Sequence, residues 1–191
     1  MSEGEGRSNG EGGSYHRRRM NTLIQKDALH NIGLIARRIA KKEVVTFWFV
    51  LLQDKSYSPL SGSVTDLVNN QNKRVKIQAL NIMADFLNHI GPFVSLAQHS
   101  AKPTSYTSLS SALSSISSLH EAVLSRLSHQ LGPTELVALL KIVSLLSEHC
   151  PYSKLEPSLL DSVITSCLDL AADERNPVIQ VAILSVFCSL C

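Results

Sequence analysis

The four cysteines are the residues of this sequence whose type best suits metal or redox chemistry, and all lie in its last quarter. Cys188 and Cys191 form a CxxC pair, which is a spacing used by zinc and redox sites. A structural zinc site needs four ligands, and no second CxxC or paired histidine stands at a suitable spacing. Cys150 and Cys167 lie inside or beside apolar runs. We therefore expect no metal site and interpret the cysteines as small core residues in a reducing compartment.

His149 and Cys150 together resemble a nucleophile with its base. Adjacent residues of a helix do not face each other, and a Cys–His pair needs a third group that orients the histidine. The pattern contains no convergent set of acid, base and nucleophile. The sequence thus predicts a protein that is not an enzyme, with no cofactor and no small-molecule substrate.

A block of positive charge near the N-terminus is the best candidate for a binding site. Residues 15–42 hold eight basic residues and one acid, a net charge of +7, whereas residues 103–191 hold four basic and eight acidic residues, a net charge of −4. Such a block is typical of a nuclear-import signal, an RNA-phosphate contact or a surface for an acidic partner. A solvated helix face with basic residues in its last turn has the same appearance. The candidate binding residues are Arg17, Arg18, Arg19, Arg37, Arg38, Lys41 and Lys42.

The stretch TSYTSLSSALSSISS holds eight serines in fifteen residues. These serines are candidates for phosphorylation, which would add negative charge at the start of a helix. Leu109, Leu113 and Ile116 nevertheless keep helical spacing, so we favour a helix that carries a face of small residues.

The composition favours a helical fold without a membrane span. Hydrophobic residues make up 44% of the 191 residues and aromatic residues only 5%, so aliphatic side chains dominate, which suits helix-on-helix packing. The sequence has no apolar run of about 18 residues, and its polar start lacks the apolar core of a signal peptide. We expect a cytoplasmic or nuclear protein whose partners are other proteins; nucleic acid is a less favoured partner, and no membrane partner is expected.

Apolar residues recur at spacings of three and four along most of the chain, which predicts about eight helices in four antiparallel pairs. We assign residues 1–20 to a disordered polar and basic tail and residues 21–191 to one helical domain. The segment 44–54, VVTFWFVLLQD, is equally compatible with a strand, but its neighbours favour a helix with Trp48 in the core. Three breaks separate later helices: Gly91-Pro92, Gly132-Pro133 and Cys150-Pro151.

Two segments place polar residues and then Val at the head of an apolar helix: NNQNKRVKIQALNIMADFL and DERNPVIQVAILSVFCSL. Both resemble the second helix of a HEAT repeat. The 41-residue separation of Val137 and Val178 lies inside the roughly 40–47-residue period of HEAT and armadillo arrays. In addition, the order of TFWFVLLQD, SYTSLSSALSSISSLHEAVLSRL and LLKIVSLLSEHCPYSKLEPSLLDSVI is similar to a conserved module of a longer HEAT-repeat protein, across about residues 30–191.

This resemblance to the HEAT/armadillo-type repeat family implies an all-α fold, an α-α superhelix of about four helical hairpins. It also implies a non-enzymatic scaffold for protein–protein interaction. The alternative function is nucleic-acid or nuclear-transport-linked binding through the basic block.

The final segment, VIQVAILSVFCSLC, is apolar on all sides. Such a helix needs neighbours all round, and a terminal repeat of a solenoid needs a polar outer face. We therefore expect the last helix to be covered, either by a further repeat that a truncated sequence lacks or by a second molecule in a dimer. Of these two, we favour truncation.

Overall fold

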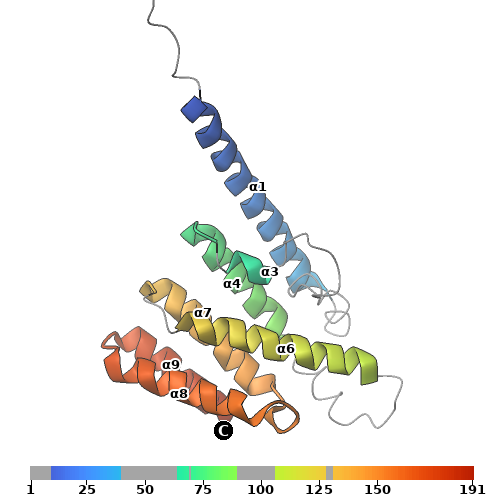
Figure 1. Ribbon diagram of the computed structural model, residues 1–191, viewed down its shortest axis with the longest axis vertical. Helices are drawn as coiled ribbons and strands as arrows, with labels where there is room; N and C mark the ends of the chain where they lie inside the picture. Colours follow the sequence, from blue (N-terminus) through green and yellow to red (C-terminus); the bar gives the residue numbers. More distant parts are fainter. Residues whose placement is uncertain (1–9, 40–63, 69, 90–105, 128–130) are drawn as a thin grey trace, which may run out of the picture.

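The computed structural model describes residues 10–39, 64–68, 70–89, 106–127 and 131–191, and every regular element in these ranges is a helix (Figure 1). The all-α class is therefore confirmed for the described part of the chain. The helices are α1 (Gly10–Arg38), α3 (Val64–Leu67), α4 (Lys73–Leu87), α6 (Tyr106–Leu127), α7 (Pro133–His149), the short 3-10 helix η3 (Tyr152–Lys154), α8 (Pro157–Asp173) and α9 (Pro177–Leu190).

The starts of the helices follow from residues that cap or begin a helix well. Asn72 precedes α4, and its side chain accepts hydrogen bonds from two backbone N–H groups of the first turn. Asn176 caps α9 in the same way through one such bond. Pro133, Pro157 and Pro177 are the first residues of α7, α8 and α9, where a missing N–H costs nothing because it would have no helical acceptor.

Four helices form one layer in which each packs against the next, in the order α1, α4, α7 and α9. The remaining helices lie against this layer: α3 packs on α4, α6 on α7 and α8 on α9, and α6 also packs on α8. The helices therefore follow one another along the long axis of the molecule, with α1 at one end and the pair α8–α9 toward the other (Figure 1).

The centre of the core is α7. Leu139, Leu140, Ile142 and Val143 are fully buried, and their positions span about 160° of the helix circumference. This pattern reflects neighbours on three sides, since α7 contacts α4, α6 and α9. Burial of each such aliphatic side chain contributes about 1.5–3 kcal/mol to the free energy of folding. The contacts of α7 are therefore a main source of stability for the helices that pack around it.

The structure differs from the sequence-based expectation at the N-terminus. Helix α1 begins at Gly10, inside the segment 1–20 that its composition assigned to a disordered tail. Arg, Met and Leu are good helix formers, and no proline interrupts residues 10–38, so a helix that packs at its C-terminal half extends backwards. The predicted helix at 44–54, with Trp48, lies outside the described residues.

The serine-rich stretch contributes to α6 from Tyr106 onward, as its leucine spacing predicted. Residues 98–105, which precede it, lie outside the described part of the chain.

Candidate functional site

A row of exposed polar residues runs along the middle of the helical layer, and we call it the lateral face. On α4, exposed residues recur every seven positions at Arg74, Asn81 and Asn88. On α7, they recur every seven positions at Thr134, Lys141 and Glu148. Residues seven apart lie on one side of a helix, so each set forms a single stripe.

The two stripes lie on the same side of the molecule because of the helices that surround them. Helix α4 has α1 and α7 beside it in the layer and α3 behind it, whereas α7 has α4 and α9 beside it and α6 behind it. The side left to solvent is in both cases the side away from α3 and α6. Together the stripes make a polar surface of mixed charge that spans two successive hairpins.

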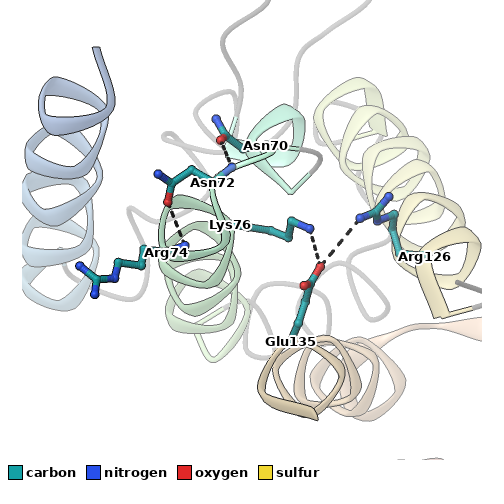
Figure 2. Close-up of polar contacts among 6 residues, drawn as sticks. All are labelled: Asn70, Asn72, Arg74, Lys76, Arg126 and Glu135. Atoms are coloured by element: carbon teal, nitrogen blue, oxygen red, sulfur yellow. Dashed lines mark hydrogen bonds and ion pairs between the residues drawn. The ribbon is translucent and has the colours of Figure 1, made fainter. Parts of the chain in front are cut away.

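An ion cluster holds α4, α6 and α7 in register on the side of α4 opposite to this face. Figure 2 shows Lys76 of α4 and Arg126 of α6 reaching the same carboxylate, that of Glu135 in the first turn of α7. The distance to Glu135 Oε1 is 2.7 Å from Lys76 Nζ and 3.8 Å from Arg126 Nη2. Glu135 Oε1 accepts no aligned hydrogen bond from the described residues, so these contacts are ion pairs.

The cluster is substantially shielded from solvent, since the exposed fraction of the side chain is 7% for Glu135, 14% for Lys76 and 24% for Arg126. Charges this buried require partners, and removal of one partner leaves the others uncompensated. The carboxylate also lies at the positive end of the α7 dipole, which favours it. The cluster therefore positions the two halves of the lateral face relative to each other.

Asn70 and Asn72 shape the turn that leads into α4. The backbone N–H of Asn72 donates to Asn70 Oδ1 at 2.8 Å, and Asn72 Oδ1 accepts from the backbone N–H of Arg74 at 3.1 Å (Figure 2). These bonds satisfy donors that the first helical turn leaves free, so α4 starts at a defined residue and Arg74 takes a fixed place on the lateral face.

A buried polar cluster joins α6, α7 and η3, and sequence reasoning missed it. His120 is fully buried, with Nδ1 3.9 Å from Cys150 Sγ and Nε2 3.4 Å from the Tyr152 hydroxyl. The Tyr152 hydroxyl also donates to Ser147 Oγ at 3.2 Å. The histidine that Cys150 meets is thus His120 rather than its chain neighbour His149. The spacing of residues along the sequence could not predict the contact between His120 and Cys150, because this contact depends on how two hairpins pack.

This Cys–His contact is unsuited to nucleophilic chemistry. Burial lowers the pKa of His120 to about 4 and raises the pKa of the Cys150 thiol to about 12. Burial also raises the pKa of Tyr152 to about 12, despite the opposing effect of its hydrogen bond to Ser147. At neutral pH the imidazole is therefore uncharged and the thiol protonated, and no thiolate forms. The cluster satisfies buried polar groups between hairpins.

The structure separates the basic block into two parts. Arg17 and Arg19 are exposed near the start of α1, and Arg38 is exposed at its end, so about 30 Å of helix lies between them. Arg37 is not free, because its Nε donates to Asp85 of α4 at 2.9 Å. The backbone of Arg18 lies in α1, and Lys41 and Lys42 lie outside the described residues. The described basic residues therefore do not gather at one place.

The cysteines also divide into two kinds. Cys167 is buried and Cys150 partly buried, as the apolar runs predicted, whereas Cys188 and Cys191 are exposed, and the prediction was wrong for this pair. Cys188 is exposed because it lies on the side of α9 opposite to the buried Ile179, Ile183 and Val186, and Cys191 follows the last residue of the helix. In the described ranges, no group of three or more His, Cys, Asp or Glu residues is placed to hold a metal ion.

Among the helices of the described residues, none combines the length and apolar character that a membrane crossing requires.

Comparison with known proteins gives one match. Searches of curated proteins and of solved structures find no similar protein. The sequence model of a family described as a domain of unknown function, DUF4042, matches residues 24–191. Because this match covers most of the chain, from the middle of α1 to the last residue, the chain belongs to the DUF4042 family.

Proposed function

We propose that this chain is a non-enzymatic scaffold of the HEAT-repeat type that binds other proteins, built as an α-α superhelix of about four helical hairpins. The observation that carries the proposal is the order of packing. Each helix of the layer contacts the next one, from α1 to α4, α7 and α9, and the second-layer helices α6 and α8 also contact each other. Packing of each hairpin only on its neighbours is the defining property of a repeat array.

The spacing of contacting serines supports the repeat. The hydroxyl oxygen of Ser144 in α7 lies 3.4 Å from that of Ser185, 41 residues later, and 2.7 Å from that of Ser189, 45 residues later, both in α9. The first of these separations equals that of Val137 and Val178, which lie in the same two helices. Equivalent positions of successive repeats lie side by side in such arrays, so these two separations favour a repeat of about 40–47 residues. On the segment order given above, we also propose a relationship to a module of HEAT repeat-containing protein 6.

We place the binding surface on the lateral face. Its six residues are polar, carry both signs of charge and continue from one hairpin to the next. A polar row of this kind suits an extended or helical segment of another protein, whose side chains can meet successive stripes. The four free cysteines favour a cytoplasmic or nuclear location for this interaction.

Nucleic-acid or nuclear-transport-linked binding through the basic block is the second candidate, favoured by the exposed Arg17, Arg19 and Arg38. It ranks second because Arg37 is held by Asp85 and the two exposed groups lie at opposite ends of α1. Contacts to phosphate give an affinity that falls steeply with salt, which separates this function from the first.

The test compares two variants with the same change in charge. Asn81→Lys with Glu148→Lys alters the lateral face, and Ser118→Lys with Glu121→Lys alters exposed positions of α6 on the opposite layer. Each variant and the unmodified chain serve as bait in a cell extract, and captured proteins are quantified by mass spectrometry. We expect specific protein partners that survive nuclease, are lost with the lateral-face variant and remain with the α6 variant.

A third bait tests the alternative by changing Arg17, Arg19 and Arg38 to Gln. Loss of all partners with this bait or after nuclease treatment, together with a steep dependence on salt, would assign binding to the basic block and refute the scaffold proposal.

A further inference from the structure

Helix α9 exposes a continuous apolar face on the side opposite its core contacts. Ile179, Ile183 and Val186 are buried against the rest of the molecule. On the other side, Val178, Val181 and Leu184 are 62%, 65% and 60% exposed. Cys188 of α9 and Leu168 of the neighbouring α8 are exposed as well, and we group these residues as the α9 end face. Exposed apolar surfaces of this kind normally mark an interface.

Helix α1 exposes a second apolar face at the other end of the array. Leu29 and Ala36 are buried toward α4. On the opposite side of the helix, Ile24 is 61% and Ile35 54% exposed, and three further large apolar residues accompany them. We call this set the α1 end face: Met20, Leu23, Ile24, Leu34 and Ile35.

The two ends carry opposite charge. Helix α1 has six basic and two acidic residues, and with Arg37 paired to Asp85 of α4 its net charge is +3. Residues 157–191, which contain α8 and α9, have four acidic residues and one basic residue, a net charge of −3. Asp161 lies seven residues before the exposed Leu168, so an acid and an apolar residue share one side of α8. Opposite charge around two apolar faces favours their association and disfavours pairing of like ends.

We propose that this chain binds a second copy of itself end to end, with the α1 end face of one copy packed on the α9 end face of the next. The occupant is a second copy, rather than the further repeat that the sequence alone favoured, because one chain carries both faces with complementary charge. Two α9 end faces or two α1 end faces would bring like charges together. Such an interface is heterologous: it produces an open row of copies, or a ring if the rotation between copies closes. This self-association does not depend on the scaffold function proposed above.

The experiment measures the sedimentation of the reduced protein over a wide range of concentration, with two variants that each alter one face. Ile24→Asp with Ile35→Asp alters the α1 end face, and Val181→Asp with Leu184→Asp alters the α9 end face. All four side chains are more than half exposed, so these changes leave the fold intact, which circular dichroism and the unfolding midpoint verify. Gln71→Glu with Ser118→Asp is a control with the same charge change at exposed positions outside the lateral face and both end faces.

We expect the unmodified chain and the control to associate as concentration rises. Each face variant associates at least about 30-fold more weakly, which is the effect of losing one interface hot spot. An equimolar mixture of the two face variants forms pairs of unlike chains and nothing larger, because the mixture supplies one intact face of each kind. Pairing also slows alkylation of Cys188, which lies on the α9 end face.

Three results would overturn the proposal. The first is an unmodified chain that stays monomeric at every concentration, which would mean that something other than a second copy covers these faces. The second is a face variant that still pairs with itself, which would show an interface between two identical faces. The third is association of the unmodified chain with no complex in the mixture of variants.

Discussion

The ion cluster around Glu135 makes a sharp prediction about stability. Glu135→Gln keeps the shape of the side chain but removes the charge that Lys76 and Arg126 share. Breaking a buried ion pair by removing one partner costs about 3–5 kcal/mol. We expect a loss of about 3 kcal/mol in the free energy of unfolding, at the lower end of that range, because Lys76 and Arg126 keep 14% and 24% side-chain exposure.

For a chain of this length, a loss of about 3 kcal/mol lowers the Tm by about 6–12 °C. The assay is urea unfolding, together with thermal unfolding, followed by circular dichroism. Asp85→Asn serves as the matched control, because it removes a carboxylate from the Arg37–Asp85 pair, where the Arg37 side chain is 63% exposed. Solvent screens exposed ion pairs, so Asp85→Asn should lower the free energy of unfolding by only about 0.5 kcal/mol.

A third variant separates two contributions: the cost of leaving Lys76 and Arg126 buried without a counter-charge, and the loss of their attraction to Glu135. Replacing Lys76, Arg126 and Glu135 together by Met removes all three charges at similar volume. The triple variant should stay within about 1 kcal/mol of the unmodified chain, and so be more stable than Glu135→Gln alone. Equal losses for Glu135→Gln and Asp85→Asn, or a triple variant less stable than the single one, would refute this reasoning.

Four further predictions follow from individual residues. The free energy of unfolding should fall by about 3 kcal/mol as the pH drops from about 6.5 to 4. The reason is that His120 becomes protonated in the unfolded chain, whereas burial holds its pKa near 4 in the folded protein. Urea unfolding at a series of pH values should show a weaker pH dependence for His120→Gln. Iodoacetamide should modify the exposed Cys188 in the folded protein but Cys167, whose pKa burial raises to about 11, only on unfolding, as peptide mass spectrometry would reveal. Asn72→Ala should lower the free energy of unfolding by about 1 kcal/mol through loss of the α4 cap, with Asn72→Asp neutral in the same urea assay. Leu139→Ala should lower it by about 3 kcal/mol, since this fully buried side chain leaves a cavity in α7, and a loss below about 1 kcal/mol would contradict the packing described.

The local part of this fold could be predicted from the sequence. Apolar residues at spacings of three and four predicted α4, α6, α7, α8 and α9, because a helix that buries one side needs that period. Prolines marked the starts of α7 and α9, since the first turn of a helix tolerates a missing N–H. The extent of α1 escaped prediction, because the polar composition of residues 10–20 resembles that of a disordered segment.

Contacts between hairpins could not be predicted from local pattern. Glu135 meets Lys76, and His120 meets Cys150, only because separate helices pack at particular positions. The recurrence of polar residues at Arg74, Asn81 and Asn88 is visible in the sequence. Periodicity alone does not show which polar side of a helix stays exposed to solvent after the other helices pack against it. The basic block was predicted as one site because its residues are close in sequence, whereas a long helix carries Arg17 and Arg38 far apart.

The central claim, that the lateral face binds a protein, is tested most directly by cross-linking from defined positions in cells. A photo-reactive amino acid is placed at Asn81 or Lys141 of the lateral face, or at Ser118 of the opposite layer, all of which are exposed. We predict that positions 81 and 141 cross-link to the same protein partner, that nuclease does not affect this product and that position 118 does not give it. Cross-links to nucleic acid, or equal capture of the partner from position 118, would contradict the claim.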